Sequence, residues 1–533
     1  MSRSEVLIGI DAGTSVIKAV AFTADGEALG QCSRQNHYNT LDNGGVEQGM
    51  QRTFDDTVAV LEELISAIPE LAERVVGLAV TGQGDGTWLA DARGQPLHDG
   101  WLWLDGRSGA EAAYLEQLPR YDEVYARTGT GVNVCQMRTH LTWMKRHAKD
   151  LLKSSATAFH CKDWLYFGLT GERATDPSEG VFGFGSYQTR DYDDVVIDAL
   201  ELADLRELLP PIVDGMKTSA PLIDSIAART GLPAGLPVTL GYVDVICSAL
   251  GGGLYSGDGV PGLSIVGSTG MHMRLVRQAS DVVLNAERTG YTMCFPGDCH
   301  AQMQSNMAAT LNIDWLLDTI IDANRFAGFD TSRTELLARL DALVATAEPG
   351  RLLYHPYASR AGERGPFIDP MARASLIGLD GSSGLAEVSR AVFEGLALAA
   401  RDCFDAMGER PAEVRLSGGA ARSPVLRSII AAALGRPVRV VERDEAGAAG
   451  ACMMAATALG LHESLDTCVE EWVDAYLGEA QPPDPELAAQ FDTLMPIYRQ
   501  ARQSLGPVWE TLAAVRHEAD GQVSGQHLSE SSR

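Results

Sequence analysis

Near the start of the chain, Asp11 is followed within four residues by Gly13 and by the hydroxyl side chains of Thr14 and Ser15. The amides and hydroxyls of a tight turn can hold phosphate oxygens, and a carboxylate beside them can face a hydrated divalent cation. The same composition also occurs in turns that bind nothing. The segment therefore indicates a nucleotide-phosphate site only if matching parts occur elsewhere in the chain.

Residues 267–269, Gly-Ser-Thr, form a second segment of this kind. Strand-like runs lie on both sides of it, as residues 7–10 and 16–20 do around Asp11. Two hairpins of this pattern predict that one structural plan is used twice in the chain. Farther on, Gly418, Gly419 and Ala420 follow another strand-like run, and backbone this bare can lie against a flat ring such as adenine.

Asp244 is a second carboxylate at the end of a strand-like run. Residues 238–242 are typical of a strand, and the apolar residues after Asp244 are small enough for a closely packed helix. In open α/β sheets, ligands bind at the carboxyl ends of the strands, where this side chain would lie. An acid at a helix start is also an ordinary N-cap, so both interpretations remain open.

Two further stretches combine residue types that a hydroxyl-rich ligand would need. The first contains Gln83, Gly84 and Asp85 after a buried strand-like run. The second is Trp-Leu-Trp-Leu-Asp-Gly-Arg at residues 101–107, in which a ring could stack on C–H faces, a carboxylate could accept from O–H groups and a guanidinium could donate. A core strand ending in a surface ion pair explains the second stretch equally well.

Hydrophobic periodicity predicts the elements that would position these residues. Apolar residues at helical spacing predict a helix over residues 50–68, and the β-type run 75–81 is typical of a buried parallel strand. Helices are also expected over residues 306–321, 385–407 and 446–459. We expect further helices to about residue 517 and a polar, disordered tail from residue 519 onward.

Length and composition limit the possible functions. A chain of 533 residues exceeds what one core can organise, so two or more domains are expected. A formal net charge of −28 argues against nucleic acid or an anionic membrane as partner, because both require clustered positive charge. Local amides and one cation can still hold a phosphorylated ligand inside an acidic protein.

The nine cysteines show no spacing typical of zinc or of a disulfide framework, which predicts reduced thiols and a cytoplasmic location. Cys294, Cys299 and His300 come nearest to a metal motif, but no second pair accompanies them and a structural role is favoured. The N-terminus is not typical of a signal peptide, and no apolar run is long enough to cross a bilayer.

The chain lacks a P-loop motif and lacks a Gly-x-Gly-x-x-Gly after its first strand, which argues against P-loop and Rossmann proteins. In the order and spacing of its motifs it resembles the FGGY family of carbohydrate kinases, to roughly residue 515. The motifs that carry this resemblance are residues 10–15, 81–83, 103–107, 175–178, 241–244, 267–269, 362–364 and 417–420.

The resemblance implies an α/β fold of two ribonuclease-H-like domains, as in actin-like ATPases, flanking a nucleotide cleft. The expected divisions are residues 1–255 for the polyol, the first phosphate turn and the catalytic base, and residues 256–462 for the second phosphate turn and the adenine platform. C-terminal helices would occupy residues 463–517 and the disordered tail residues 518–533.

The resemblance also implies roles for matching residues. Asp244 is expected to be the catalytic base, and Asp11 to orient hydrated Mg²⁺ through water. The residues expected to bind ATP are Asp11, Gly13, Thr14, Ser15, Lys18, Gly267, Ser268, Thr269, Gly418, Gly419, Ala420 and Ser423. The residues expected to bind the substrate are Gln83, Gly84, Asp85, Trp103, Asp105, Arg107 and Asp244.

The segment around Gly84 and Asp85 resembles the erythritol kinase branch, whereas glycerol kinases carry Arg-Glu and xylulokinases Met-His-Gly after the glutamine. This resemblance implies transfer of a phosphoryl group from ATP to a terminal hydroxyl of erythritol. Another polyol or a ketopentose such as xylulose is the alternative. A non-catalytic nucleotide sensor and an acetate-kinase-like enzyme are rivals from other classes. The oligomeric state is open, with a homodimer among the options.

Overall fold

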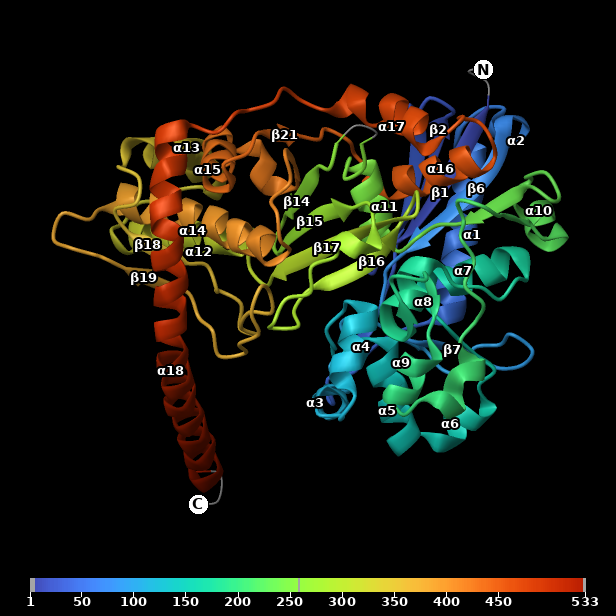
Figure 1. Ribbon diagram of the computed structural model, residues 1–533, viewed down its shortest axis with the longest axis horizontal. Coiled ribbons are helices and arrows are strands. Elements are labelled where there is room, and N and C mark those ends of the chain that lie inside the picture. Colours follow the sequence, from blue (N-terminus) through green and yellow to red (C-terminus); the bar gives the residue numbers. More distant parts are fainter. Residues whose placement is uncertain (1–4, 257–258, 531–533) are drawn as a thin grey trace.

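A computed structural model describes residues 5–256 and 259–530, with side chains described to residue 516. Two six-stranded sheets organise it (Figure 1). The first sheet has the order β12-β13-β6-β1-β2-β3. Its strands are β1 (Val6–Ala12), β2 (Val16–Thr23), β3 (Ala28–Gln35), β6 (Val75–Gly82), β12 (Ala220–Pro221) and β13 (Pro237–Leu240).

The second sheet repeats this plan. Its order is β16-β17-β15-β14-β20-β21, built from β14 (Gly262–Val266), β15 (Gly270–Val276), β16 (Tyr291–Phe295), β17 (Cys299–Asn306), β20 (Val414–Ser417) and β21 (Val438–Val440). In each sheet the opening hairpin is antiparallel, and the first strand of that hairpin pairs in parallel with a later strand. The predicted reuse of one α/β plan is therefore confirmed.

Strand β1 is buried on both faces, which explains its continuous apolar sequence. Its alternate residues Val6, Ile8 and Ile10 pack with helix α1 (Met50–Ala67), while Leu7 joins a different core. Helices α11 (Asp244–Gly251) and α16 (Ala446–Ala458) form that second core with Leu7. The strand thus holds a rigid position between two helical layers, and the turn after it is fixed in space.

Helix α16 comes from the far end of the chain and packs against β1, β6 and α11 (Figure 1). Its run of alanines and glycines allows the close approach to α11. Just before this helix, Glu445 forms an ion pair with Lys18 of β2 at 2.7 Å. The last part of the second half therefore completes the first half.

Most of the remaining helices cover the sheets or form the lower helical region in Figure 1 around α3 to α6 and α9, while the long α18 packs on α15 and α14 and extends away from the second half. They are α2 (Leu71–Arg74), α3 (Gly109–Glu116), α4 (Tyr121–Thr128), α5 (Met137–His147), α6 (Lys149–Ser154), α7 (Cys161–Thr170), α8 (Pro177–Phe184), α9 (Asp194–Ala199), α10 (Asp224–Thr230), α12 (Thr310–Phe326), α13 (Arg333–Thr346), α14 (Leu385–Ala406), α15 (Pro424–Leu434), α17 (Leu465–Trp472) and α18 (Pro485–Glu530).

Short elements complete the chain. The strands are β4 (Asn39–Thr40), β5 (Val46–Gln48), β7 (Trp88–Ala90), β8 (Gly100–Trp101), β9 (Thr157–Phe159), β10 (Gly185–Ser186), β11 (Asp191–Tyr192), β18 (Leu353–His355) and β19 (Ser375–Ile377). The 3₁₀ turns are η1 (Ala203–Leu208), η2 (Ala279–Asp281), η3 (Gly419–Arg422) and η4 (Asp474–Tyr476).

Several expected elements differ from those observed. The helix expected from residue 306 begins at Thr310, because Asn306 is the last residue of β17. Helix α18 continues to Glu530, beyond residue 517, where the sequence predicts that the helices end. Cys294 and Cys299 lie on the paired strands β16 and β17, and all nine cysteines are free thiols. Within the described residues, no helix is both long and apolar enough to cross a membrane.

Candidate active site

A cavity of about 310 Å³ lies where the two halves of the chain meet. Thr14, from the β1–β2 turn, and Thr269, from the β14–β15 turn, both line it. Asp244, at the start of α11, lines the same space. The two phosphate-type turns and the candidate base, far apart in sequence, therefore converge on one site.

The carboxylate of Asp244 is held at the first residue of α11, directly after the N-cap position of Val243. Its Oδ1 accepts a hydrogen bond from the Val245 N–H at 2.6 Å. The Val243 N–H donates to Ser178 Oγ at 3.0 Å, which fixes the entry into the helix. Burial, with the negative charge of Asp11 added to it, raises the pKa of Asp244 well above its usual value. A carboxylate in this state has a strong affinity for a proton, as a general base requires.

Asp11 is the last but one residue of β1 and lies opposite Lys18 in the β1–β2 register. Burial raises its pKa to about 6, although Lys18 opposes the shift; Glu445 adds to it. A Cβ at Gly447 would lie 2.5 Å from Asp11 Oδ2, so bare backbone leaves room beside the carboxylate. The described residues contain no cluster of three acids, histidines or cysteines that could hold a metal. The single buried carboxylate with bare backbone beside it would suit a hydrated Mg²⁺, which takes few ligands directly from protein.

Gln83 orients the first turn from behind. Its Oε1 accepts from Thr14 Oγ1 at 2.9 Å, and its amide donates to Gln48 Oε1 at 2.6 Å. Thr14 Oγ1 in turn accepts from the indole N–H of Trp103 at 2.7 Å. Trp103 and Thr14 line the cavity, whereas Gln83 is buried behind them. The structure therefore gives Gln83 a supporting contact rather than a place on the wall of the cavity.

Asp105 and Arg107 bond chiefly to one another and to strand β5. Asp105 accepts from the Val46 N–H at 2.8 Å and pairs with Arg107 at 2.6 Å. Arg107 also pairs with Glu47 at 2.8 Å and lies over the ring of Trp101. Neither side chain lines the cavity that holds Asp244, although Asp105 borders an adjoining cavity of about 550 Å³. The ion pair that the sequence predicts here is present, but it is buried rather than at the surface, with the side chains of Arg107 and Asp105 7% and 0% exposed.

The remaining residues of the first turn and Lys18 already have partners. The carbonyl oxygens of Gly13 and Ser15 accept from Asn36 at 2.9 and 2.8 Å, which fixes the backbone of the turn. The ammonium group of Lys18 is engaged by Glu445. These contacts make the turn rigid before any ligand arrives.

In the second half, the turn at Gly267 and Ser268 is held by helix α12. The N–H groups of Ala309 and Thr310 donate to the carbonyl oxygens of Ser268 and Gly267 at 2.8 and 2.9 Å. Only Thr269 of this turn lines the cavity.

The bare backbone predicted at Gly418, Gly419 and Ala420 follows β20. Gly418 has a φ of +88°, which glycine adopts without strain. Ser423 caps α15, accepting from the Leu426 N–H at 3.0 Å and donating to Asp341 at 2.7 Å. These four residues do not line the cavity around Asp244, so an adenine platform here would lie apart from it.

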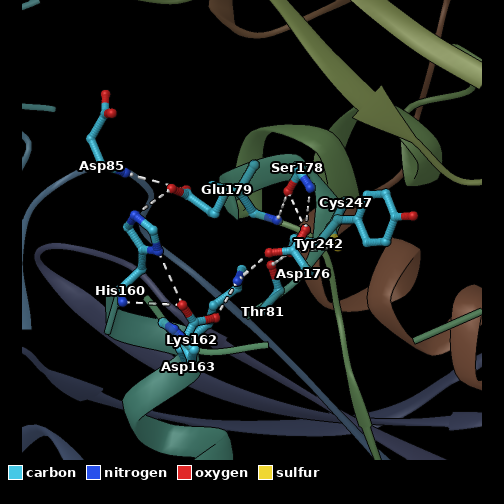
Figure 2. A network of polar contacts seen from close by, with 12 residues as sticks. Thr81, Asp85, His160, Lys162, Asp163, Asp176, Ser178, Glu179, Tyr242 and Cys247 are labelled. Atoms are coloured by element: carbon cyan, nitrogen blue, oxygen red, sulfur yellow. Dashed lines mark hydrogen bonds and ion pairs between the residues drawn. The ribbon is translucent and has the colours of Figure 1, made fainter. Parts of the chain in front are cut away.

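The cavity also contains residues that the sequence analysis did not select. Asn133, Glu179, Tyr291, Asn306 and Arg364 all line it. Glu179 belongs to a chain of buried polar contacts that joins α7 and α8 (Figure 2). One sequence signal could have indicated a residue such as Glu179: the glycine at position 84 leaves space on the cavity wall that another part of the chain has to fill.

Comparisons with known proteins agree with this geometry. Residues 6–251 match the N-terminal domain, and residues 262–459 the C-terminal domain, of the FGGY family of carbohydrate kinases. An erythritol kinase of Brucella abortus (strain 2308) is 48% identical over 96% of this chain and 98% of its own length. A xylulose kinase of Bacillus subtilis (strain 168) is 26% identical over 92% of this chain and 96% of its own. The crystal structure of a xylulose kinase from Rhodospirillum rubrum superimposes with a TM-score of 0.84 at 28% identity, covering 95% of this chain and 100% of that one.

Proposed function

The chain belongs to the FGGY family of carbohydrate kinases, phosphotransferases with an alcohol group as acceptor, and we propose that its acceptor is erythritol. The observation that carries the kinase mechanism is the single cavity lined by Thr14, Thr269 and Asp244. The choice of erythritol rests on the 48% identity to an erythritol kinase, compared with 26% for a xylulose kinase. A ketopentose such as xylulose is the second candidate.

In the proposed reaction, ATP is the donor and a terminal hydroxyl of the polyol is the acceptor. Asp244 takes the hydroxyl proton as the oxygen forms a bond to the γ-phosphorus. The bond from that phosphorus to the β–γ bridging oxygen breaks, and ADP leaves with the electron pair. The raised pKa of Asp244 supports this role, since its carboxylate has a strong affinity for the proton. General bases contribute typically ~10²–10⁴-fold to such steps.

The other residues would position the two substrates. Thr14 and Thr269 face the cavity from opposite halves and would contact the phosphates of ATP with their hydroxyls and turn amides. Gly418, Gly419 and Ala420 would support the adenine ring, with Ser423 nearby. Such fixed donors suit phosphoryl transfer, which depends mainly on position and charge stabilisation.

Mg²⁺ is the metal that we propose, with Asp11 orienting its water shell. When bound, Mg²⁺ neutralises charge on the phosphates. The raised pKa of Asp11 falls when a cation lies beside its carboxylate, so its protonation and the binding of the ion would oppose each other.

We also propose the division of the chain at residues 255 and 462 that the sequence predicts, whereas helix α18 continues through residue 517. The nine free thiols support a reducing compartment, for which the cytoplasm is our proposal.

The test is acceptor-dependent consumption of ATP by the purified protein, measured across polyols and ketoses of three to six carbons. We expect erythritol to give the highest kcat/KM and the product to carry one phosphate on a terminal carbon. A nucleotide sensor would consume no additional ATP with any acceptor. A higher kcat/KM for xylulose would replace erythritol by the second candidate.

A further inference from the structure

Glu179 is a buried carboxylate that borders the cavity, with only 1% of its surface exposed. Its Oε1 accepts from the Asp85 N–H at 3.3 Å. Its Oε2 is buried and lies 3.0 Å from His160 Nε2, an ion pair drawn in Figure 2. Oε2 therefore faces His160, and Oε1, which has one long hydrogen bond and lies beside Gly84, is the oxygen that retains acceptor capacity next to the cavity.

The Glu179 carboxylate lies where a side chain at position 84 would otherwise be. A Cβ added at Gly84 would lie 2.5 Å from Glu179 Oε1 and 2.4 Å from Val243 Cγ2. A larger residue at position 84 would consequently displace the carboxylate. The chain thus fills this part of the wall from α8, and the bare backbone at residue 84 is what permits it.

Buried partners hold Glu179 in place. His160 Nδ1 lies 3.0 Å from Asp163 Oδ2, and Lys162 pairs with Asp163 at 2.6 Å. Lys162 also pairs with Asp176, the residue that caps α8 by accepting from the Ser178 N–H at 2.7 Å. Figure 2 shows this chain of contacts running from Asp163 through His160 to Glu179. The orientation of Glu179 is therefore set before a substrate binds.

We infer that Glu179 discriminates between polyols and ketoses, an inference that rests on the proposed function. An ionised carboxylate only accepts hydrogen bonds, and Glu179 borders the cavity. A polyol hydroxyl can donate to it. A ketone oxygen cannot donate and would place one acceptor against another, leaving both without a partner.

The experiment compares Glu179→Gln with wild type at pH 8. Burial raises the pKa of Glu179 to about 7, although His160 opposes the shift, so at pH 8 the carboxylate is ionised. The amide supplies an N–H donor in nearly the same volume. We expect the ratio of kcat/KM for erythritol to kcat/KM for xylulose to fall at least ~10-fold in the variant. The matched control is Glu111→Gln, a buried carboxylate of α3 paired with Arg146 outside the cavity, which should leave the ratio unchanged.

Gly84→Ala tests the same point by another route, because its Cβ would push Glu179 out of position. It should shift the ratio in the same direction, and thermal unfolding and ATP binding would report whether either variant is folded. An unchanged ratio, or an equal loss for both acceptors, would overturn the inference and leave Glu179 a structural residue.

The direction of the change in the ratio decides the inference, whichever acceptor the wild-type protein prefers. If wild type prefers xylulose and the ratio still falls in Glu179→Gln, the inference stands and only the choice of erythritol as substrate is rejected. A wild type that uses neither compound would reject the proposed function and the inference together.

Discussion

Two groups of carboxylates lie side by side in the first half of the molecule and have opposite electrostatic properties. In the ion cluster of Lys162, Asp163 and Asp176, burial alone would raise the pKa of Asp163. Lys162 and His160 outweigh it and hold the pKa at about 2. On the cavity wall, burial raises the pKa of Asp85, Glu179 and Asp244 above their usual values.

Burial is common to both groups, so the difference comes from their partners. Lys162 has two carboxylates within ion-pair distance, whereas Asp244 has one backbone N–H and acidic neighbours. Lys162 bridges the two acids of the ion cluster, whereas no cation in the described residues lies within ion-pair distance of Asp244. A deficit of positive charge at a cavity is typical of sites where a ligand or metal ion completes the arrangement. The following variants test that contrast.

The largest expected effect is on turnover in Asp244→Asn. The amide keeps the shape of the side chain but cannot take the hydroxyl proton, so kcat should fall by roughly 10²–10⁴-fold. Removing an unpaired carboxylate should leave thermal stability unchanged or higher. Steady-state kinetics and ATP binding measured separately would establish that only the chemical step is lost.

Asp163→Asn is the comparison variant for Asp244→Asn. Because it disturbs the ion cluster, it should lower the unfolding temperature. Its kcat should change less than that of Asp244→Asn. Near-normal turnover in Asp244→Asn would remove that residue from the role of base.

Next in size is the loss of stability in Lys162→Met. Lys162 is fully buried, and its removal leaves Asp163 and Asp176 without their shared cation. Breaking a buried pair in this way costs about 3–5 kcal/mol. Urea unfolding followed by tryptophan fluorescence would measure it.

The control for Lys162→Met is Lys145→Met, which removes the exposed pair with Asp204. A surface pair of this kind contributes less than about 1 kcal/mol. Equal losses in the two variants would show that the ion cluster has no special importance for stability.

The smallest effect is on the pH dependence of stability. The pKa of Glu179 rises from 4.5 to about 7 on folding, so between those values the folded state binds more protons than the unfolded state. Stability from this group is therefore present below pH 4.5 and is lost as pH rises toward 7. The groups that face Glu179 are His160, Lys162, Asp85 and Asp176.

Unfolding free energies of wild type and Glu179→Gln, measured from pH 4.5 to 8, would test this. Relative to the variant, wild type should lose up to about 3 kcal/mol across the window. A flat difference, or one that grows in favour of wild type, would contradict the raised pKa. The ion cluster predicts the reverse sign for Asp163, whose contribution is lost only as pH falls below 3.8.

Much of the fold could be predicted from the sequence because its signals are local. Runs such as residues 7–10 and 262–266 contain the β-branched and aliphatic residues that favour buried strands, and the turns after them contain glycine and hydroxyls. Strand β17 is not predicted because Cys299–Asn306 contains no Val, Ile, Thr, Tyr, Phe or Trp, the residue types that favour strands. It is a strand because it pairs with β15 and β16 on either side, which only the tertiary structure determines.

In the candidate site, too, local motifs indicate some of the residues and not others. Thr14, Asp85 and Asp244 follow strands within recognisable motifs, and they line the cavity. Glu179 is 94 residues from Asp85 in sequence, and no local pattern indicates that the two meet. Asp105 and Arg107 have residue types that suit a ligand, but their contacts with Val46 and Glu47 could not be derived from composition.

The packing of α16 against β1 and β6 has a consequence for how the chain is made. Leu7 and Ala79 emerge early in synthesis, yet they share a core with Ala448 and Cys452, which emerge near the end. Until α16 has left the ribosome, one face of the first sheet has no cover and is open to misassociation. Contacts of such long sequence separation also favour slow folding, so the nascent chain has to remain soluble with this apolar face bare.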